Sequence, residues 1–296
     1  MRKIILTILL TLVVSGVYQP AQASLISDYS YRREQVRESK QDVKAIKDLF
    51  KKQSYYANKH DSKGLATLYD DKFMNNDGFN KEVYFKSIES TWEACEDLSY
   101  ATKILSISVN GDYATVDVEE VANGTVMEKY DYMQIAGEIH SLSEGIYHLE
   151  KTNGKWYIAG ETSISDESSL LYGDARFMNI DLQVPAQVAS GDDYTTTLKI
   201  DADEDNFILG SIDHDMVTYP TNPPRNELRA LPRSGVLERI IKANTDNLNE
   251  YAVASLAISR VTPLGEDNVK IRMAGLACIM KRINVVPKNN FIKLED

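Results

Sequence analysis

The sequence predicts an α+β domain followed by an all-β sandwich. Three observations lead to this fold class. Apolar residues recur at helical spacing through the first hundred residues of the chain. Alternating apolar and polar residues follow, broken by three Asn-Gly pairs of the kind that favours hairpin turns. Beyond Tyr172 the alternation continues in short runs without a convincing helical stripe. A length of 296 residues suits about two domains.

The first 23 residues have the layout of a secretory signal peptide. Arg2 and Lys3 precede the apolar run Ile4–Val17, and the small residues of Ala21-Gln22-Ala23 are typical of a cleavage site. The run is shorter than the roughly 20 apolar residues of a spanning helix, so an uncleaved anchor is the less favoured alternative. We therefore expect cleavage before Ser24, no membrane span in the mature chain, and a periplasmic or extracellular location.

Charge and cysteine content narrow the function classes. The formal net charge is -11, which argues against binding a phosphate backbone, so no nucleic acid is expected as a partner. Two cysteines, Cys95 and Cys278, are too few to staple a chain of this size, although an exported protein enters a disulfide-permissive compartment. Two buried free thiols are favoured over a bridge between them.

Three helices are expected in the first hundred residues. Residues 24–42 predict a polar helical arm, and the helix continues to His60 with one apolar face. Asp61 and Ser62 can cap a short second helix that carries Leu65, Leu68 and Tyr69. Asn80 can cap a third helix with one stripe of apolar residues, Tyr84, Ile88, Trp92 and Cys95.

Strands follow these helices, separated by Asn110-Gly111, Asn123-Gly124 and Asn153-Gly154. The expected strands are 104–109, 113–121, 126–133, 145–151 and 155–164. The order and spacing of three pieces, 60–73, 107–116 and 152–158, resemble the nuclear transport factor 2-like superfamily, including its SnoaL-like and ketosteroid-isomerase-like branches. The resemblance covers about Val43 to Ile164. It implies that residues 43–164 form a cone-shaped curved antiparallel sheet with three N-terminal helices and a pocket at the open end. It also implies that the exposed sheet face could form a homodimer.

A second domain is expected after a linker at residues 165–175. Residues 176–290 contain about seven short runs of strand character, which is the number expected of a β-sandwich. The rhythm looks immunoglobulin-like, but the Cys…Trp…Cys core of that fold is missing. The expected strands are 180–188, 194–200, 207–212, 236–242, 251–258, 269–278 and 283–286.

Motifs for metal or cofactor chemistry are sparse. The four histidines lack zinc-binding spacing, and neither a phosphate loop nor a dinucleotide fingerprint occurs, so no cofactor is expected. Asp201, Asp203 and Asp205 alternate as calcium ligands do. However, Asn206 and Ile212 replace the Gly and Glu of a calcium loop, which favours an acidic turn.

The resemblance implies one candidate catalytic residue. Ketosteroid-isomerase-like members use an Asp after the second helix as a general base, and alignment places Asp77 near that position. The family's tyrosine donor corresponds to Gln53 here, with Tyr55 and Tyr56 displaced by two and three positions. Asp77 fits a polar turn equally well. The cone could be lined by aromatic residues, which are otherwise expected to form core: Tyr55, Tyr69, Phe73, Tyr84, Trp92, Tyr130 and Tyr132.

These observations favour an exported, non-catalytic two-domain protein that binds a small ligand or a protein partner. An isomerase- or dehydratase-type enzyme that uses the cone pocket is one alternative, and a purely structural envelope module is another. The enzyme alternative requires Asp77 to face the pocket with a hydrogen-bond donor in reach.

Overall fold

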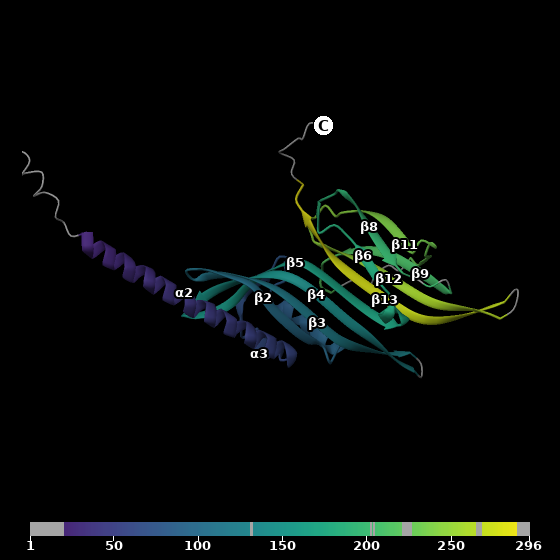
Figure 1. The fold of residues 1–296 in the computed structure, drawn as a ribbon, viewed down its shortest axis with the longest axis horizontal. Helices are drawn as coiled ribbons and strands as arrows, with labels where there is room; N and C mark the ends of the chain where they lie inside the picture. Colours follow the sequence, from purple (N-terminus) through teal and green to yellow (C-terminus); the bar gives the residue numbers. More distant parts are fainter. Residues whose placement is uncertain are drawn as a thin grey trace, which may run out of the picture. The chain divides into compact units, whose positions relative to one another are not determined.

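The computed structural model describes residues 21–130, 133–201, 203, 205–220, 227–264 and 268–288, with side chains from residue 39 onward except 128–134 (Figure 1). The chain divides into two compact units, Met1–Lys47 and Asp48–Asp296. Helix α2 (Ala21–Asn58) begins in the first unit and ends in the second. Of the signal peptide expected at residues 1–23, only the last three residues lie within the described part, at the start of α2. In the described part of the chain, no helix combines the length and apolar character needed to cross a bilayer.

The second unit is mostly β-sheet. Its main sheet has ten strands in the order β10-β9-β12-β13-β5-β4-β3-β2, with β1 beside β5 and β7 beside β13. A second sheet has three strands in the order β11-β8-β6. The strands of the main sheet are β1 (Tyr69–Asn75), β2 (Ser99–Asn110), β3 (Tyr113–Tyr130), β4 (Met133–Thr152), β5 (Lys155–Gly173), β7 (Gln187–Ala189), β9 (Asn206–Met216), β10 (Arg229–Ala230), β12 (Glu250–Pro263) and β13 (Val269–Val286). Those of the smaller sheet are β6 (Ile180–Gln183), β8 (Asp193–Ile200) and β11 (Val236–Lys242).

Two short helices of the second unit begin at side-chain caps. Asp61 accepts a hydrogen bond from the Gly64 amide at 2.8 Å and starts α3 (Ser62–Ala66). Asn80 accepts one from the Val83 amide at 3.0 Å and starts α4 (Lys81–Ala94). The sequence placed Tyr69 in the helix that became α3, which is wrong. Tyr69 instead begins β1, which pairs in parallel with β5.

A helix layer covers one face of the sheet formed by β1 to β5. The Phe50 ring packs edge-on against Tyr147 at 5.3 Å between centroids, and Tyr69 packs against Phe85 at 5.2 Å. Alternate residues of the strands point into this layer, as a pleated sheet requires. The buried apolar residues of β3, β4 and β5 are Ala114, Val116, Val118, Tyr147, Leu149, Trp156 and Ile158.

Two of the three Asn-Gly pairs form hairpin turns. Gly111 and Asn153 adopt positive φ values of 60° and 52° between β2 and β3 and between β4 and β5. The third pair, Asn123-Gly124, lies inside β3 instead of in a turn. A Cβ added at Gly124 would lie 2.5 Å from the sulfur of Cys95, so this glycine allows a close approach between the strand and the end of α4.

The linker expected at 165–175 is wrong in structural terms, because residues up to 173 belong to β5 and Asp174–Phe177 form a 3₁₀ helix, η1. From Glu167 to Gly173, β5 pairs antiparallel with β13 (Figure 1). Both halves of the second unit therefore share one continuous sheet. The expected immunoglobulin-like sandwich is not seen as a separate domain.

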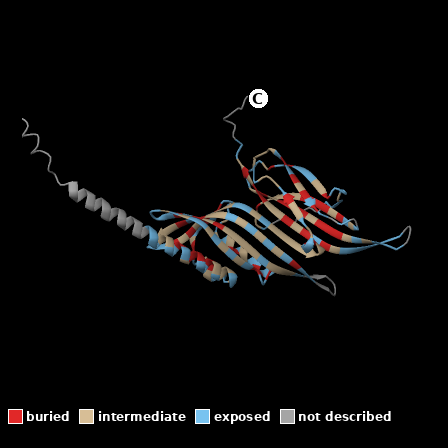
Figure 2. Cartoon of the chain, viewed as in Figure 1, coloured by how far each residue is buried: buried red, intermediate tan, exposed pale blue. Residues whose placement is uncertain are grey.

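The second half is nevertheless two-layered. The three-stranded sheet packs over β9, β12 and β13, and Figure 2 shows buried residues concentrated along these strands. Leu182 and Leu198 from the small sheet meet Ile258 and Ile283 from the large one, and all four are fully buried. Cys95 is buried and Cys278 on β13 is half-buried, and both thiols are free.

Candidate functional site

A cavity of about 120 Å³ lies between the helix layer and the sheet in the first half of the second unit. We call it the inner cavity. Residues from α2, α3, α4 and four strands line it: Gln53, Ser54, Ala57, Leu65, Tyr69, Tyr84, Ile88, Trp92, Tyr100, Thr102, Glu120 and Tyr147.

The structure brings together Tyr69, Tyr84 and Trp92 of the residues expected to line a pocket. Phe73 is buried one layer away, with its ring centroid 4.9 Å from that of Tyr84. The expectation for Tyr55 is wrong, because this side chain is 60% exposed. Gln53 and Ala57 are four positions apart and share the inner face of α2, so Tyr55, midway between them, faces elsewhere. The side chain of Tyr130 and all of Tyr132 lie outside the described residues.

Gln53 brings an amide into the inner cavity. It is only 6% exposed, and its Nε2 donates a hydrogen bond to the Tyr69 hydroxyl at 3.2 Å. Its Oε1 is buried without a hydrogen-bond partner. Buried acceptors are rarely left unpaired, because an unpaired acceptor has lost its hydrogen bonds to water and gains no protein partner in their place. Gln53 stands where the resemblance placed an oxyanion donor, but its nitrogen is already bound to Tyr69.

Glu120 is the carboxylate of the inner cavity, and no sequence motif predicted a role for it. Thr102 Oγ1 donates to its Oε1 at 2.9 Å, and the Tyr147 hydroxyl donates to its Oε2 at 3.1 Å. Burial raises the pKa of Glu120, and these two hydrogen bonds offset part of the rise. A signal was present, because Glu120 continues the inward face of Val116 and Val118 on β3.

A second carboxylate, Glu161 on β5, lies beside the inner cavity without lining it. Burial and the charge of Glu120 raise the pKa of Glu161 to about 7. Its Oε2 is buried without a hydrogen-bond partner. A β-bulge turns it inward: Ile158 pairs with Leu149 and Gly160 with His148, so Ala159 is an extra residue on β5.

The hydroxyls around the inner cavity stay protonated at neutral pH. Burial raises the pKa values of Tyr69, Tyr84 and Tyr147, and the charges of Glu161 and Glu120 raise them further. Burial also raises the pKa of Tyr100 to about 12, although the Trp92 indole donates to its hydroxyl at 2.9 Å. The cavity therefore combines neutral phenols with one carboxylate, Glu120, and no Lys, Arg or His is among its lining residues.

Asp77 does not reach the inner cavity, which removes the expected general base. Its Oδ1 and Oδ2 accept hydrogen bonds from the Arg282 guanidinium at 2.6 and 3.0 Å, and Asn249 Nδ2 donates to Oδ1 at 2.7 Å. The Asp77 and Arg282 side chains are 5% and 1% exposed. Both carboxylate oxygens are therefore occupied by donors from β13 and from Asn249, and neither points into the inner cavity. Asp77 instead fixes the turn after β1 to β13.

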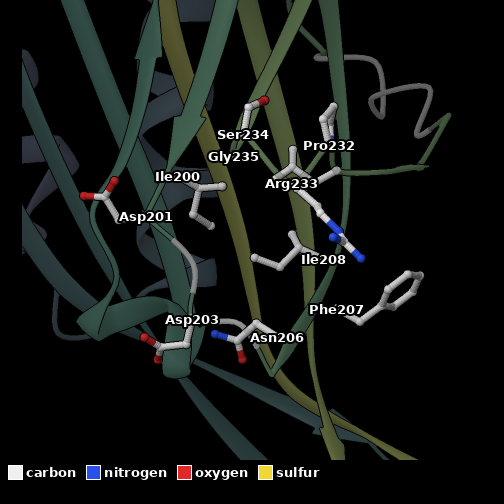
Figure 3. A pocket seen from close by; sticks show the side chains of 11 residues that line it. Ile200, Asp201, Asp203, Asn206, Phe207, Ile208, Pro232, Arg233, Ser234 and Gly235 are labelled. Atoms are coloured by element: carbon white, nitrogen blue, oxygen red, sulfur yellow. The ribbon is translucent and has the colours of Figure 1, made fainter.

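A larger cavity of about 880 Å³ lies in the second half, where β8 ends and β9 begins (Figure 3). Figure 3 shows the carboxylate of Asp201 pointing away from the other labelled side chains, while Asp203 and Asn206 lie together. Asp201 accepts a hydrogen bond from Asn179 at 3.1 Å. Among the described residues, no three His, Cys, Asp or Glu side chains gather as metal ligands, so Asp201, Asp203 and Asp205 do not form the calcium loop considered from the sequence. Residues 202 and 204 of this segment lie outside the described part.

Comparison with solved structures gives partial likenesses. A scytalone dehydratase-like protein from Novosphingobium aromaticivorans is 18% identical, with a TM-score of 0.36, over 43% of this chain and 86% of that one. A hexachlorocyclohexane dehydrochlorinase from Novosphingobium barchaimii is 16% identical, with a TM-score of 0.33, over 41% and 84%. An NTF2-like family protein from Streptomyces avermitilis, assigned as a dehydratase, is 13% identical, with a TM-score of 0.31, over 42% and 96%. No protein-family model and no curated protein matches the chain.

Proposed function

We propose that this chain is an exported protein that binds a small molecule in the inner cavity. The observation that carries the proposal is the unpartnered Oε1 of Gln53 in a cavity that also holds the Glu120 carboxylate. A bound molecule with a hydrogen-bond donor would satisfy the Gln53 acceptor. Leaving a buried acceptor without a partner costs about 1–3 kcal/mol. The signal-peptide layout of residues 1–23 supports export.

The size of the inner cavity limits what it can hold. At about 120 Å³ it is slightly smaller than an apolar cavity of about 150 Å³ that takes benzene. The cavity therefore suits a molecule of a few heavy atoms, or one end of a longer molecule. Its hydroxyl, amide and carboxylate groups favour a polar occupant over a hydrocarbon.

Filling the cavity should abolish binding. Ala57→Phe places a ring in the inner cavity, while Ala94→Phe makes the same change at an exposed position near the end of α4. We expect at least one of propylammonium, propanol, acetone and propionate to bind the parent chain and Ala94→Phe, but not Ala57→Phe. Ligand-observed NMR measures this binding. The proposal fails if none of the four binds, or if Ala57→Phe binds as well as Ala94→Phe.

Proton transfer is a second candidate function, in line with an isomerase- or dehydratase-type enzyme. Glu161 favours it, because its pKa is raised to about 7 and its Oε2 is unpartnered. Asp77 and Arg282 act on Glu161 in opposite directions, and Tyr84 offsets part of the rise. The raised pKa means that Glu161 changes from acid to base as the pH rises through about 7.

Deuterium exchange into acetone tests this candidate, since a carboxylate base would take a C–H proton and return a deuteron from solvent. We expect exchange to be faster with the chain than without it, and to increase as the pH rises through about 7 because the base must be ionised. Glu161→Gln and Glu120→Gln should slow exchange, while Glu119→Gln, which pairs with Lys103 on the other face of β3, should not. Exchange no faster than in buffer would leave binding as the only function proposed.

A further inference from the structure

The inner cavity has the electrostatics of a cation site. Glu120 supplies a carboxylate in the lining, and no lining residue carries a positive charge. Glu161 adds a second carboxylate close enough for the charge of Glu120 to act on it. An anionic molecule would be repelled by the Glu120 carboxylate, and also by Glu161 once the pH is high enough to ionise it.

The positive charge that acts on Glu161, Arg282, does not cancel this field. Arg282 approaches from β13, but both oxygens of Asp77 accept hydrogen bonds from its guanidinium, so the two groups form a neutral pair. Arg282 and Asp77 accordingly act on Glu161 in opposite directions. Arg282 therefore adds no net positive charge beside Glu161.

Aromatic rings make up much of the remaining wall. Cations are attracted to the faces of Trp and Tyr rings, and cages of such rings recognise ammonium groups. The His60 ring stacks on the Trp92 ring, with 4.8 Å between the two centroids and an angle of 9° between the ring planes. The aromatic residues of the lining are Tyr69, Tyr84, Trp92, Tyr100 and Tyr147.

One unsatisfied acceptor lies in the lining of the inner cavity, and a second lies beside the cavity. Gln53 is more than nine-tenths buried, and its Oε1 has no partner while its Nε2 is bound to Tyr69. Glu161 Oε2 is also unpartnered. An ammonium group has three donors and no acceptor, which is the complement of this set. A hydroxyl offers one donor, and a carboxylate offers none.

We propose that the inner cavity takes an organic ammonium ion, either a small protonated primary amine or the amine end of a longer molecule. The inference rests on the proposed binding function and names the class of ligand for the same site. The ammonium contacts Glu120 and Gln53, and its alkyl chain packs against the tyrosine rings.

Three probes of similar size and different charge test this inference: propylammonium, propanol and propionate. Binding to the full chain is followed by calorimetry and by the fluorescence of Trp92, which lines the cavity. We expect propylammonium to bind at least about tenfold more tightly than propanol, and propionate not to bind. Glu120→Gln should reduce propylammonium affinity about tenfold or more and leave propanol unchanged. Glu119→Gln keeps the neighbouring position and should change neither.

The outcomes separate this inference from the proposed function. If propanol or propionate binds as tightly as propylammonium, and Ala57→Phe abolishes that binding, the cavity binds small molecules but the cation preference is wrong. If none of the three probes binds, the inference fails, and the proposed function fails as well if acetone also does not bind. Equal loss of propylammonium affinity in Glu119→Gln and Glu120→Gln would assign the effect to the overall charge of the chain and overturn the inference. Thermal unfolding of each variant confirms that it is folded.

Discussion

Asp77→Ala should lower the free energy of unfolding by about 3–5 kcal/mol, because it leaves the buried guanidinium of Arg282 without its counter-charge. Asn249 Nδ2 would lose its acceptor as well. The destabilisation should extend beyond this turn, since the ion pair joins the turn after β1 to β13. Urea unfolding followed by circular dichroism measures the loss.

Two comparisons make this prediction specific. Removing both charges with Asp77→Leu and Arg282→Met should be close to neutral or even stabilising, because no lone buried charge remains. Asp174→Ala breaks the exposed pair with Arg260 and should cost at most about 1 kcal/mol. A loss below about 1 kcal/mol for Asp77→Ala would show that the ion pair does not hold the two elements together.

Leu198→Ala should destabilise both halves of the second unit, by about 2–5 kcal/mol. Leu198 on β8 is fully buried between the three-stranded sheet and the main sheet, so its truncation leaves a cavity there. Both tryptophans of the chain, Trp92 and Trp156, lie in the first half. Because β5 and β13 join the halves in one sheet, we expect fluorescence and circular dichroism to report one common transition at lower denaturant.

The control for Leu198→Ala is Ile240→Ala on β11 of the same small sheet. Ile240 is 73% exposed, so its truncation should change stability by no more than about 0.5 kcal/mol. If the two halves were independent domains, they would unfold in separate transitions. In that case Leu198→Ala would leave the tryptophan transition in place, and circular dichroism would show two steps.

Local signals predicted local structure well in this chain. Asp61 and Asn80 cap the helices that follow them, because an N-cap needs only its own next turn. The Asn-Gly signal failed at Gly124 because the reason for that glycine is tertiary: Cys95 and Leu98 approach its backbone. The polar residues before Leu170 suggested a linker because β5 is half-exposed there, although β4 and β13 pair on its two edges.

In the candidate site, too, residues placed by local patterns could be predicted and residues placed by tertiary contacts could not. The stripe of Tyr84 and Trp92 could be read from helical periodicity, and Glu120 could have been read from strand alternation. Glu161 could not, because the bulge at Ala159 that reverses its direction is visible only in the pairing with β4. The partner of Asp77 was also beyond reach, since Arg282 lies 205 positions along the chain. Helical or strand periodicity cannot predict a contact between residues so far apart in the chain.

The shared strand β5 also orders events during synthesis. One edge of β5 pairs with β4, which precedes it in the chain, and β1 covers the first part of the other edge. From Glu167 to Gly173 the same edge pairs with β13, which is made only after β6 to β12. Until β13 emerges, this edge of β5 from Glu167 onward has no strand beside it, and its backbone groups can pair with another chain. The first half therefore cannot complete its own sheet. During synthesis, this edge of β5 must be kept from pairing with strands of other chains until β13 covers it.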